Sequence, residues 1–214
     1  MSILGVDWAT IGDLTLRHLY LAGVPLLIGL AISLPLGWLA HRLRWLGPPI
    51  IGGTGLLYTI PSLALFIMLP LILGTQILDD SNVLVAMTLY SVALLTRTVA
   101  DGLASVPTAV RAAATAIGYG ELRRLVAVDL PLAIPVITAG MRVTAVSNVS
   151  IVSIAALIGV SQLGMLFTEG FNRNAMGPIV VGVGACVALS MSLDALIALA
   201  SRLLTPWLTR SVAT

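Results

Sequence analysis

Five long apolar stretches restrict the fold of this chain more than any other feature of its sequence. They run from Leu19 to Ala40, Ile50 to Leu73, Val83 to Leu95, Ile134 to Leu157 and Pro178 to Leu199. A helix that crosses a bilayer needs roughly 20 mostly apolar residues, so the third stretch is marginal unless Thr96 to Val99 completes it. The pattern predicts an all-α, polytopic membrane protein with five transmembrane helices.

The composition excludes several other classes of protein. Hydrophobic residues make up 58% of the 214 residues and charged residues only 9%, whereas about a quarter of the residues in a soluble domain are charged. The net charge of +2 is too small to indicate a nucleic-acid-binding surface. Cys186 is the only cysteine, so we expect neither an internal disulfide nor a thiolate metal site. Too little chain remains for a separate catalytic domain, and we expect no catalytic residue.

The arginines indicate the orientation, because cytoplasmic loops of membrane proteins are enriched in positive charge. Eight of them follow the first stretch, separate the third from the fourth, or follow the fifth: Arg42, Arg44, Arg97, Arg111, Arg123, Arg124, Arg202 and Arg210. The other side carries Arg17 and Arg173 together with Asp79, Asp80 and Glu169. We therefore expect a multi-pass protein of the plasma (inner) membrane with its N-terminus outside and its C-terminus in the cytoplasm.

This orientation divides the chain into three parts. Residues 1–18 form an N-terminal extracytoplasmic segment, in which Trp8 to Arg17 mixes apolar and charged residues at helical spacing and is expected to lie along the membrane surface. Residues 19–205 form the membrane domain, including a cytoplasmic loop at 97–133. Residues 206–214 form a cytoplasmic tail.

The second apolar stretch contains helix-breaking residues. Three glycines lie near its start, and Pro61 and Pro70 follow. A proline removes an intrahelical hydrogen bond, and lipid cannot satisfy the backbone groups that are freed. The stretch is therefore predicted to be a broken helix that faces the protein interior, with Pro61 and Ser62 as candidate pore-lining residues. A structural helix with a simple kink is the alternative.

The loop between the third and fourth stretches contains a short predicted helix and a spaced motif. Pro107 is suited to a first helical turn, Val110 to Ile117 is alanine-rich, and Gly118 and Gly120 are suited to end a helix. A second amphipathic piece is expected to end at Pro131. The motif consists of Ala112, Ala113 and Ala114, three further residues, Gly118, nine further residues, and then Val128, Asp129, Leu130 and Pro131.

This spacing resembles the EAA-x3-G-x9-I-x-L-P pattern of the permeases of binding-protein-dependent ABC importers. The chain departs from the pattern at Ala112, where the family usually has Glu, and at Val128, where it has Ile. The resemblance implies a type I importer fold in which this helix docks into a groove on an ATPase and transmits its movement to the membrane helices. Arg111 and Glu121 are the nearby candidates to replace the missing carboxylate.

A wider resemblance, from about residue 18 to residue 174, indicates the subfamily. The stretches HLYLAGVPLLIGLAISLPLG, YTIPSLALF and LPLAIPVITAGMRVTAVSNVSIVSIAALIG look like the permeases of osmoprotectant importers, which move glycine betaine, choline, carnitine or related quaternary amines. Permeases for methionine, molybdate or phosphonate share a similar fold and are the alternatives for the cargo. An ion-coupled secondary transporter and a structural membrane scaffold are alternatives of other classes.

Several polar residues lie within or beside the apolar stretches. Arg142 and Asp194 have similar calculated depths from the cytoplasmic side, and we hypothesise that they form an intramembrane pair. Asn148 and Ser150 place a polar patch in the fourth stretch, and they either bond to neighbouring helices or line the pore. His18 and His41 lie far apart on either side of the first stretch and are expected to be interfacial, without a metal.

The chain is expected to work only with partners. It contains no lysine and therefore no Walker phosphate loop, so ATP and Mg are expected on a partner and not on this chain. The expected partners are a cytoplasmic ABC ATPase dimer, an extracytoplasmic substrate-binding protein and membrane lipid. The two halves of the chain show no repeat, so we also expect pairing with a second copy or with a homologous permease.

Overall fold

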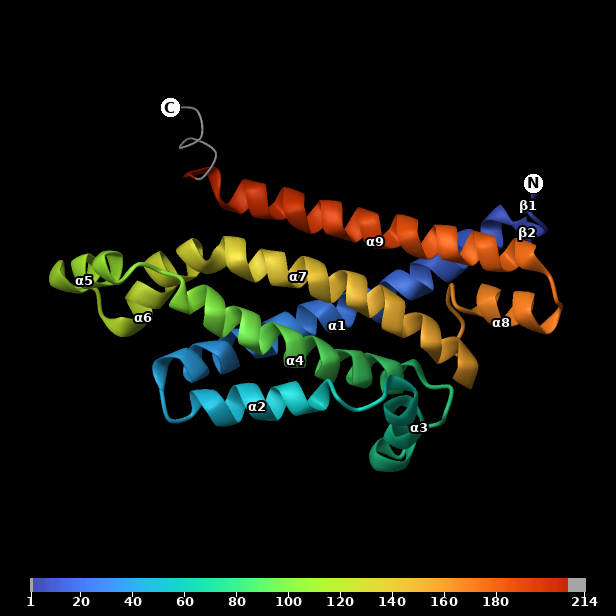
Figure 1. The fold of residues 1–214 in the computed structure, drawn as a ribbon, viewed down its shortest axis with the longest axis horizontal. Helices are drawn as coiled ribbons and strands as arrows, with labels where there is room; N and C mark the ends of the chain where they lie inside the picture. Colours follow the sequence, from blue (N-terminus) through green and yellow to red (C-terminus); the bar gives the residue numbers. More distant parts are fainter. Residues whose placement is uncertain (1, 208–214) are drawn as a thin grey trace.

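The computed structural model describes residues 2–207, and these form a bundle of helices (Figure 1). A short antiparallel hairpin of β1 (Ser2–Ile3) and β2 (Val6–Asp7) precedes the helices. The helices are α1 (Trp8–Arg42), α2 (Gly47–Leu57), α3 (Ser62–Leu73), α4 (Asp80–Ala104), α5 (Thr108–Ala116), α6 (Glu121–Arg124), the π-helix η1 (Leu125–Asp129), α7 (Leu130–Val152), the 3-10 helix η2 (Ser153–Ile158), α8 (Met165–Asn172) and α9 (Met176–Leu204).

Four segments are long and apolar enough to cross a membrane. They are α1, α4, the continuous run Glu121–Ile158 and α9. The pair α2 and α3 passes the same test together but is bent by 96°, and it brings the number of candidate spans to five if it is counted as one. The sequence-based prediction of an all-α protein with about five spans is therefore confirmed.

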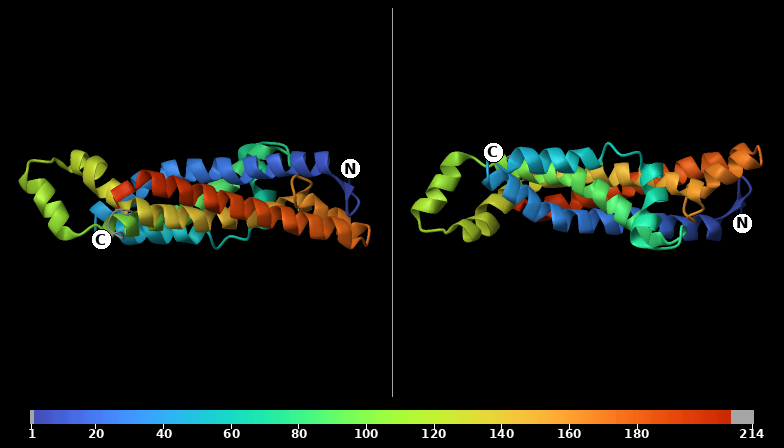
Figure 2. Two further views of the ribbon diagram at one scale, coloured as in Figure 1. Left: turned by 90° about the horizontal axis from the view of Figure 1, so that it is seen from above. Right: turned by 90° about the horizontal axis from the view of Figure 1, so that it is seen from below.

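The long helices run side by side along the longest dimension of the molecule (Figures 1 and 2). Helix α4 packs against α1 on one side and α7 on the other, and α9 packs along α7. Helices α2 and α3 cover α4 from outside the bundle. The short helices α5 and α6 project beyond one end of the bundle, whereas α8 and the N-terminal hairpin lie at the other end (Figure 2).

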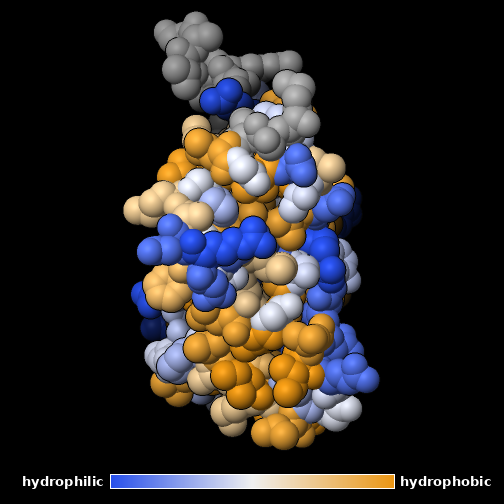
Figure 3. Space-filling model, turned by 90° about the vertical axis from the view of Figure 1, so that its right-hand side faces the viewer, coloured by the Kyte–Doolittle hydropathy of each residue, from blue (hydrophilic) through white to orange (hydrophobic). Residues whose placement is uncertain are grey.

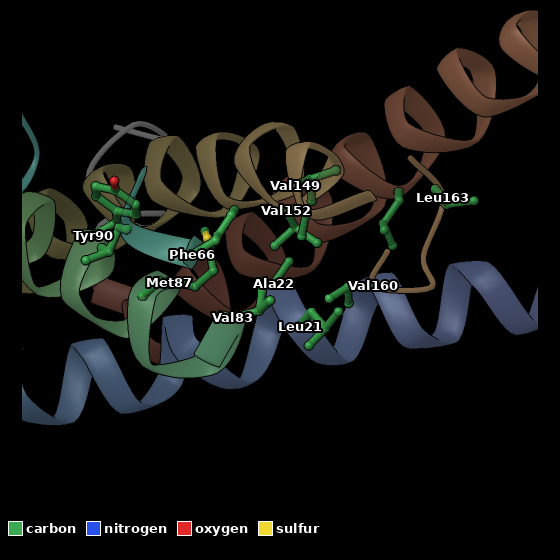
Figure 4. Close-up of a cluster of buried hydrophobic side chains, with 14 of the residues drawn as sticks. Leu21, Ala22, Phe66, Val83, Met87, Tyr90, Val149, Val152, Val160 and Leu163 are labelled. Carbon is green, nitrogen blue, oxygen red and sulfur yellow. The ribbon is translucent and has the colours of Figure 1, made fainter. Parts of the chain in front are cut away.

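The main hydrophobic core lies in the half of the bundle nearer α8 (Figure 4). Leu21 and Ala22 from α1, Met87 from α4 and Val152 from α7 are buried there with Phe66 from α3. A buried methionine or leucine contributes about 2 kcal/mol relative to its exposed state when it leaves water, but in lipid such contacts stabilise through close packing. The core therefore fixes the mutual positions of four segments that are far apart in the sequence.

Two glycines allow the close approach of α1 to α4. A Cβ atom at Gly29 would lie 2.4 Å from the Cβ of Ser91, and one at Gly37 would lie 2.6 Å from the Cβ of Val99. Both glycines are buried, and the neighbouring atoms belong to the rigid part of each side chain. Small residues at such crossings let helix backbones approach closely in membranes. The α1–α4 contact therefore depends on glycine at these positions.

The break in the second apolar stretch is confirmed, and its freed backbone is satisfied by a neighbouring helix. Residues Tyr58 to Pro61 separate α2 from α3, and the Tyr90 hydroxyl on α4 donates a hydrogen bond of 2.6 Å to the Ile60 carbonyl. The rings of Tyr58 and Tyr90 also meet edge to face at 5.7 Å. In this chain, however, α2 and α3 lie on the outside of the bundle, and only one side of α3 is buried.

The start of α4 carries a side-chain cap at the edge of the bundle. The Ser81 backbone N–H donates a 2.9 Å hydrogen bond to Asp79 Oδ1. This bond lowers the pKa of the Asp79 carboxyl below its ordinary value, because it favours the charged form. One residue further on, Asp80 accepts a 2.9 Å bond from Arg17 of α1. The two carboxylates thus fix the α4 start and tie it to α1.

Three boundaries differ from those expected from the sequence. Trp8 to Arg17 forms the first turns of α1 and is not a separate surface segment. Helix α4 continues to Ala104, so the loop that was expected to begin at 97 begins at Ser105. Pro131 does not end a helix but lies in the first turn of α7, where its missing N–H costs little. In each case the helix continues through a segment whose charged residues interrupt the apolar pattern of the sequence.

Helix α8, which the hydropathy pattern did not predict, lies at the end of the molecule opposite α5. Figure 3 shows this end of the molecule, where a band of hydrophilic side chains crosses a largely hydrophobic face. The exposed residues at the end of α8 and after it include Asn172, Arg173 and Asn174, and Arg173 forms an ion pair of 2.8 Å with Glu169. The connection between α7 and α9 therefore folds into its own structure, which includes η2 and α8.

Candidate functional site

The candidate site is the segment of residues 105–129 that projects from the bundle, which we call the coupling segment. Helix α5 begins directly after Pro107 and ends at Ala116, with Ile117 as its C-cap, close to the expected range Val110 to Ile117. Gly118 then adopts a left-handed backbone conformation with φ of +90°. The N–H of Gly118 bonds to the Thr115 carbonyl, and the N–H of Tyr119 bonds to the Ala114 carbonyl. These two bonds form a Schellman motif, which requires glycine at the left-handed position.

The motif residues of α5 point in two directions. Ala112 and Ala113 are exposed, whereas Ala114 is buried against the rest of the coupling segment. Four larger apolar side chains in the segment are also exposed, namely Val110, Ile117, Leu122 and Val126. The segment therefore presents small and apolar groups outward at one end of the bundle (Figure 2), where another protein could pack against them closely.

A buried carboxylate holds the coupling segment together. Asp129, at the end of η1, is only 6% exposed. Its Oδ1 lies 3.4 Å from Arg111 Nε on α5, and its Oδ2 lies 3.4 Å from Arg124 Nε on α6. Removal of a buried carboxylate that pairs with two cations leaves uncompensated charge, which is strongly destabilising. Asp129 therefore joins the two short helices to the beginning of α7.

The coupling segment is also tied to the ends of two other long helices. The Arg111 guanidinium donates to the Leu103 carbonyl in the last turn of α4. Arg42, in the last turn of α1, forms an ion pair with Glu121 of α6, and its guanidinium lies 5.2 Å from the centre of the Trp38 ring. A displacement of α5 and α6 would thus act on α1, α4 and α7 together.

These contacts surround a small polar cavity of about 240 Å3 at the base of the segment. It is lined by Trp38, His41, Arg42, Leu103, Arg111, Glu121, Arg124, Leu125 and Asp129. His41, expected to be a lone interfacial histidine, therefore lies among these charged groups. Asp129 occupies the unspecified position of the motif and was not predicted to have a role of its own, although a carboxylate between Val128 and Leu130 in an apolar run was a usable signal.

The remaining motif residues lie in and directly after the π-helix η1. Val128 lies in η1, and Leu130 and Pro131 form the beginning of α7. The N–H of Leu130 bonds to the Leu125 carbonyl, five residues back. This π-helical turn is consistent with the proline at 131, because a proline cannot donate the usual bond to the residue four positions earlier.

Both candidate replacements for the missing glutamate form ion pairs within this chain, although the Glu121 side chain remains 59% exposed. The Arg111 guanidinium points toward α4 and Asp129, and Glu121 pairs with Arg42. Arg123, a cation of the same segment, lies 4.5 Å from the centre of the Tyr119 ring. The surface around Ala112 therefore consists mainly of alanine and aliphatic side chains.

The polar residues selected within the membrane helices have different environments. The Arg142 guanidinium on α7 contacts the Asp194 carboxylate on α9 through two bonds of 2.6 and 2.7 Å. Asn148 is fully buried, and its amide donates to the Ala22 carbonyl of α1 and to Ser91 of α4. Ser150 lines a pocket between α7 and α9. Pro61 and Ser62 lie at the α2–α3 bend and do not join these residues.

A second buried polar cluster was not expected from the sequence. His18 was predicted to be interfacial but is fully buried. Its Nε2 lies 2.9 Å from the Val149 carbonyl, and its Nδ1 lies 3.1 Å from Gln162 Oε1. The carbonyl of Val149 is available because α7 changes into the 3-10 helix η2 three residues later. His18 thus ties α1 to the segment that follows α7.

The chain matches one protein family over most of its length. The family is described as the binding-protein-dependent transport system inner membrane component, and residues 29–209 match it. The matched range contains the coupling segment and all the long helices except the beginning of α1.

Characterised relatives share this similarity over nearly full length. The osmoprotectant import permease protein OsmW of Salmonella typhimurium is 36% identical over 200 residues, which cover 92% of each chain. The glycine betaine/carnitine/choline transport system permease protein OpuCD of Bacillus subtilis is 30% identical and covers 92% of this chain and 82% of its own length. The choline transport system permease protein OpuBD of Bacillus subtilis is 29% identical over 89% of this chain and 83% of its own.

Solved structures show the same fold. A chain from inward-facing conformations of the MetNI methionine ABC transporter superposes with a TM-score of 0.83 at 20% identity, and the match covers 92% of this chain and 97% of that chain. A chain of an amino acid ABC transporter superposes with a TM-score of 0.75 at 15% identity, over 91% and 94% of the two chains. At these identities the likeness describes the arrangement of helices alone.

Proposed function

Because the chain belongs to the family of inner membrane components of binding-protein-dependent transport systems, and is the permease component of an ABC importer, we propose that its cargo is an osmoprotectant of the quaternary-amine type. Glycine betaine, carnitine and choline are the candidates, because relatives that are about 30% identical are named as permeases for these solutes. The chain itself carries out no covalent chemistry.

The observation that carries the transport mechanism is the connection of the coupling segment to three long helices. An ATPase that grips Ala112 and Ala113 moves α5, and α5 is joined through Arg111 and Asp129 to α4 and α7. Glu121 adds the connection to α1 through Arg42. ATP binding and hydrolysis on the ATPase would thereby rock the bundle between inward and outward openings.

The docking contact is proposed to be mainly apolar. With alanine at position 112, with Arg111 paired to Asp129 and with Glu121 paired to Arg42 of α1, the exposed side of α5 offers close packing and no carboxylate. The matching groove of the ATPase is then expected to bind by shape and apolar contact. Ile117 is the most exposed large side chain of α5 and its cap.

The proposed assembly contains two permeases, two ATPases and a binding protein. A cytoplasmic ATPase dimer supplies ATP and Mg, and an extracytoplasmic protein delivers the cargo. The second permease is either another copy of this chain or a homologous one, which would provide the other half of the pathway. In this assembly the coupling segment lies in the cytoplasm and α8 lies outside.

Purification in mild detergent and transport by reconstituted vesicles test this proposal. The complex is expected to contain an ATPase and a second permease, and vesicles are expected to accumulate glycine betaine only when ATP and the binding protein are supplied on the correct sides. The matched control is a hydrolysis-deficient ATPase. Uptake driven by a sodium or proton gradient without nucleotide would contradict the proposal and favour a secondary transporter.

A further inference from the structure

An open pocket of about 660 Å3 lies between α7 and α9. Its walls are mainly apolar and include Val146, Phe167 and Val187, with Ser150, Cys186 and Asp194 among the polar groups. Pockets for small molecules have volumes of roughly 300–1,000 Å3 and combine apolar walls with a few polar groups. The size and lining therefore suit one small solute.

The ion pair of Arg142 and Asp194 lies at the edge of this pocket. Asp194 lines both this pocket and an adjoining hollow of about 380 Å3, which Arg142 lines as well. The two side chains retain 45% and 34% of their exposure in the single chain. The pair is therefore accessible from the pocket, even though each partner already has the other as a neighbour.

The position of the pair along the helices makes contact with lipid costly. Arg142 lies about 18 Å along α7 from Leu130, and Asp194 lies about 15 Å along α9 from Leu204, at 1.5 Å per residue. Charged side chains at such depth face a water-filled cavity or other protein, because a position in hydrocarbon is costly for each of them. The open side of the pair thus faces an aqueous pathway or a second subunit.

We propose that the pocket between α7 and α9 binds a small zwitterion, with its carboxylate at Arg142 and its ammonium group at Asp194. A pair of opposite charges has no net charge but a strong dipole, and a zwitterion of the glycine betaine type matches both properties. A net cation such as choline adds an uncompensated charge to the pocket, which costs free energy at this depth.

This inference rests on the proposed function, since it selects among the cargoes proposed there. It predicts that the permease itself prefers glycine betaine or carnitine to choline. It also assigns the exposed side of the Arg142–Asp194 pair to the transport pathway. If a second permease covered this surface instead, solutes would have no access to it.

The native cysteine of the chain provides the test, because Cys186 is the only cysteine and lines the pocket. The experiment uses the permease–ATPase complex in lipid nanodiscs without binding protein, so that only the permease selects the solute. A methanethiosulfonate reagent with a trimethylammonium head labels Cys186, and intact mass of this chain gives the rate. Glycine betaine at ten times its dissociation constant is expected to slow labelling about tenfold, while choline at the same concentration slows it less than about twofold.

Variants of the ion pair separate the electrostatic proposal from simple blockage. Arg142→Gln leaves Asp194 unpaired and is expected to reverse the order, so that choline protects Cys186 better than glycine betaine does. Arg17→Gln is the matched control, because it breaks an interhelical pair of 2.9 Å and similar exposure that lies outside the pocket. If Arg142→Gln does not fold, Arg142→Asp combined with Asp194→Arg retains a pair and is expected to retain the wild-type order.

Two results would overturn the proposal. In one, Cys186 fails to react in the assembled complex, which shows that protein covers the pocket. In the other, glycine betaine and choline protect equally in the wild-type complex. If either result occurs together with ATP-driven uptake of glycine betaine, the pocket proposal fails and the proposed function stands. Uptake without any need for ATP would refute the proposed function. In that case, protection of Cys186 would still show whether the pocket binds the zwitterion.

Discussion

At the scale of single residues, the coupling segment depends on a few positions whose chemistry cannot be exchanged. Gly118 takes the left-handed conformation that closes α5, and Asp129 provides a carboxylate to two arginines. Ala112, by contrast, occupies an exposed position at which the family resemblance implies a charged residue. The essential contacts inside the segment and the unusual residue on its surface thus lie within one short stretch of chain.

Gly118→Ala is expected to impair coupling, whereas Gly120→Ala is not. A side chain in the left-handed region costs about 1–2 kcal/mol, and relief of this strain would unwind the end of α5. Gly120 has a φ of −68°, which any residue adopts, and no atom lies within 4 Å of an added Cβ. ATP-driven uptake by vesicles and the ATPase activity of the same complex are measured. Equal uptake by both variants would show that the Schellman motif does not matter for coupling.

Asn148→Leu is expected to reduce stability without changing cargo preference. The amide of Asn148 is fully buried and bonds to α1 and α4, so its loss weakens the bundle by about 1 kcal/mol. Thermal unfolding in detergent measures the stability, and competition between glycine betaine and choline in the Cys186 labelling assay measures the preference. A change in preference at unaltered stability would instead place Asn148 in the transport pathway.

At the scale of elements, the arrangement links one short helix to three long ones. The α1–α4 contact is close because of Gly29 and Gly37, and Asp129 lies where α6, η1 and α7 form one continuous helical run. Rigid connections of this kind transmit a displacement, whereas a flexible loop would absorb it. The ion pairs at the base of the coupling segment are therefore expected to matter more for transport than for insertion into the membrane.

Arg124→Gln is expected to uncouple ATP hydrolysis from uptake, whereas its neighbour Arg123→Gln is not. Arg124 pairs with the buried Asp129, and its removal leaves only Arg111 to balance that carboxylate. Arg123 lies against the exposed side of Tyr119 and does not form an ion pair within the described residues. Uptake per ATP hydrolysed is expected to fall about tenfold in the first variant, as a loss of about 1.4 kcal/mol would produce. Equal ratios in the two variants would contradict the role of the Asp129 contacts.

At the scale of the whole molecule, the two ends of the bundle have different chemistry. The end that carries the coupling segment holds Arg42, Arg44, Arg123 and Arg124, while the other end carries α8 and the N-terminal hairpin (Figure 2). An excess of arginine at one end favours its retention in the cytoplasm. We therefore propose that this end, with the proposed ATPase contact, lies on the side of the membrane where ATP is present.

Labelling from the two sides of the membrane tests this orientation. In a Cys186→Ala background, Thr115→Cys on α5 and Asn174→Cys after α8 each place one exposed thiol at opposite ends of the bundle. In intact cells a membrane-impermeant maleimide is expected to label Asn174→Cys and not Thr115→Cys, and inverted vesicles are expected to show the reverse. Labelling of both in intact cells, or the opposite pattern, would refute the proposed orientation.

The sequence by itself determined the helical membrane architecture, because runs of about 20 apolar residues have few other ways to satisfy their backbone in lipid. It also determined the break at Pro61 and the helix that ends before Gly118, since proline and left-handed glycine act locally. Contacts between distant segments required the tertiary structure. Examples are the burial of His18 against Val149 and the junction of Asp129 with two arginines.

The boundaries of the helices, too, were determined in part by the sequence and in part by the tertiary structure. Hydropathy underestimated α4, because Arg97 and Asp101 interrupt the apolar pattern although they lie on an exposed side of a continuing helix. Similar depth along their helices suggested that Arg142 and Asp194 were neighbours, but only the packing of α9 on α7 decided that their side chains meet beside an open pocket. Depth along a helix is a property of the chain, whereas the direction in which a side chain points toward another helix depends on how the helices pack.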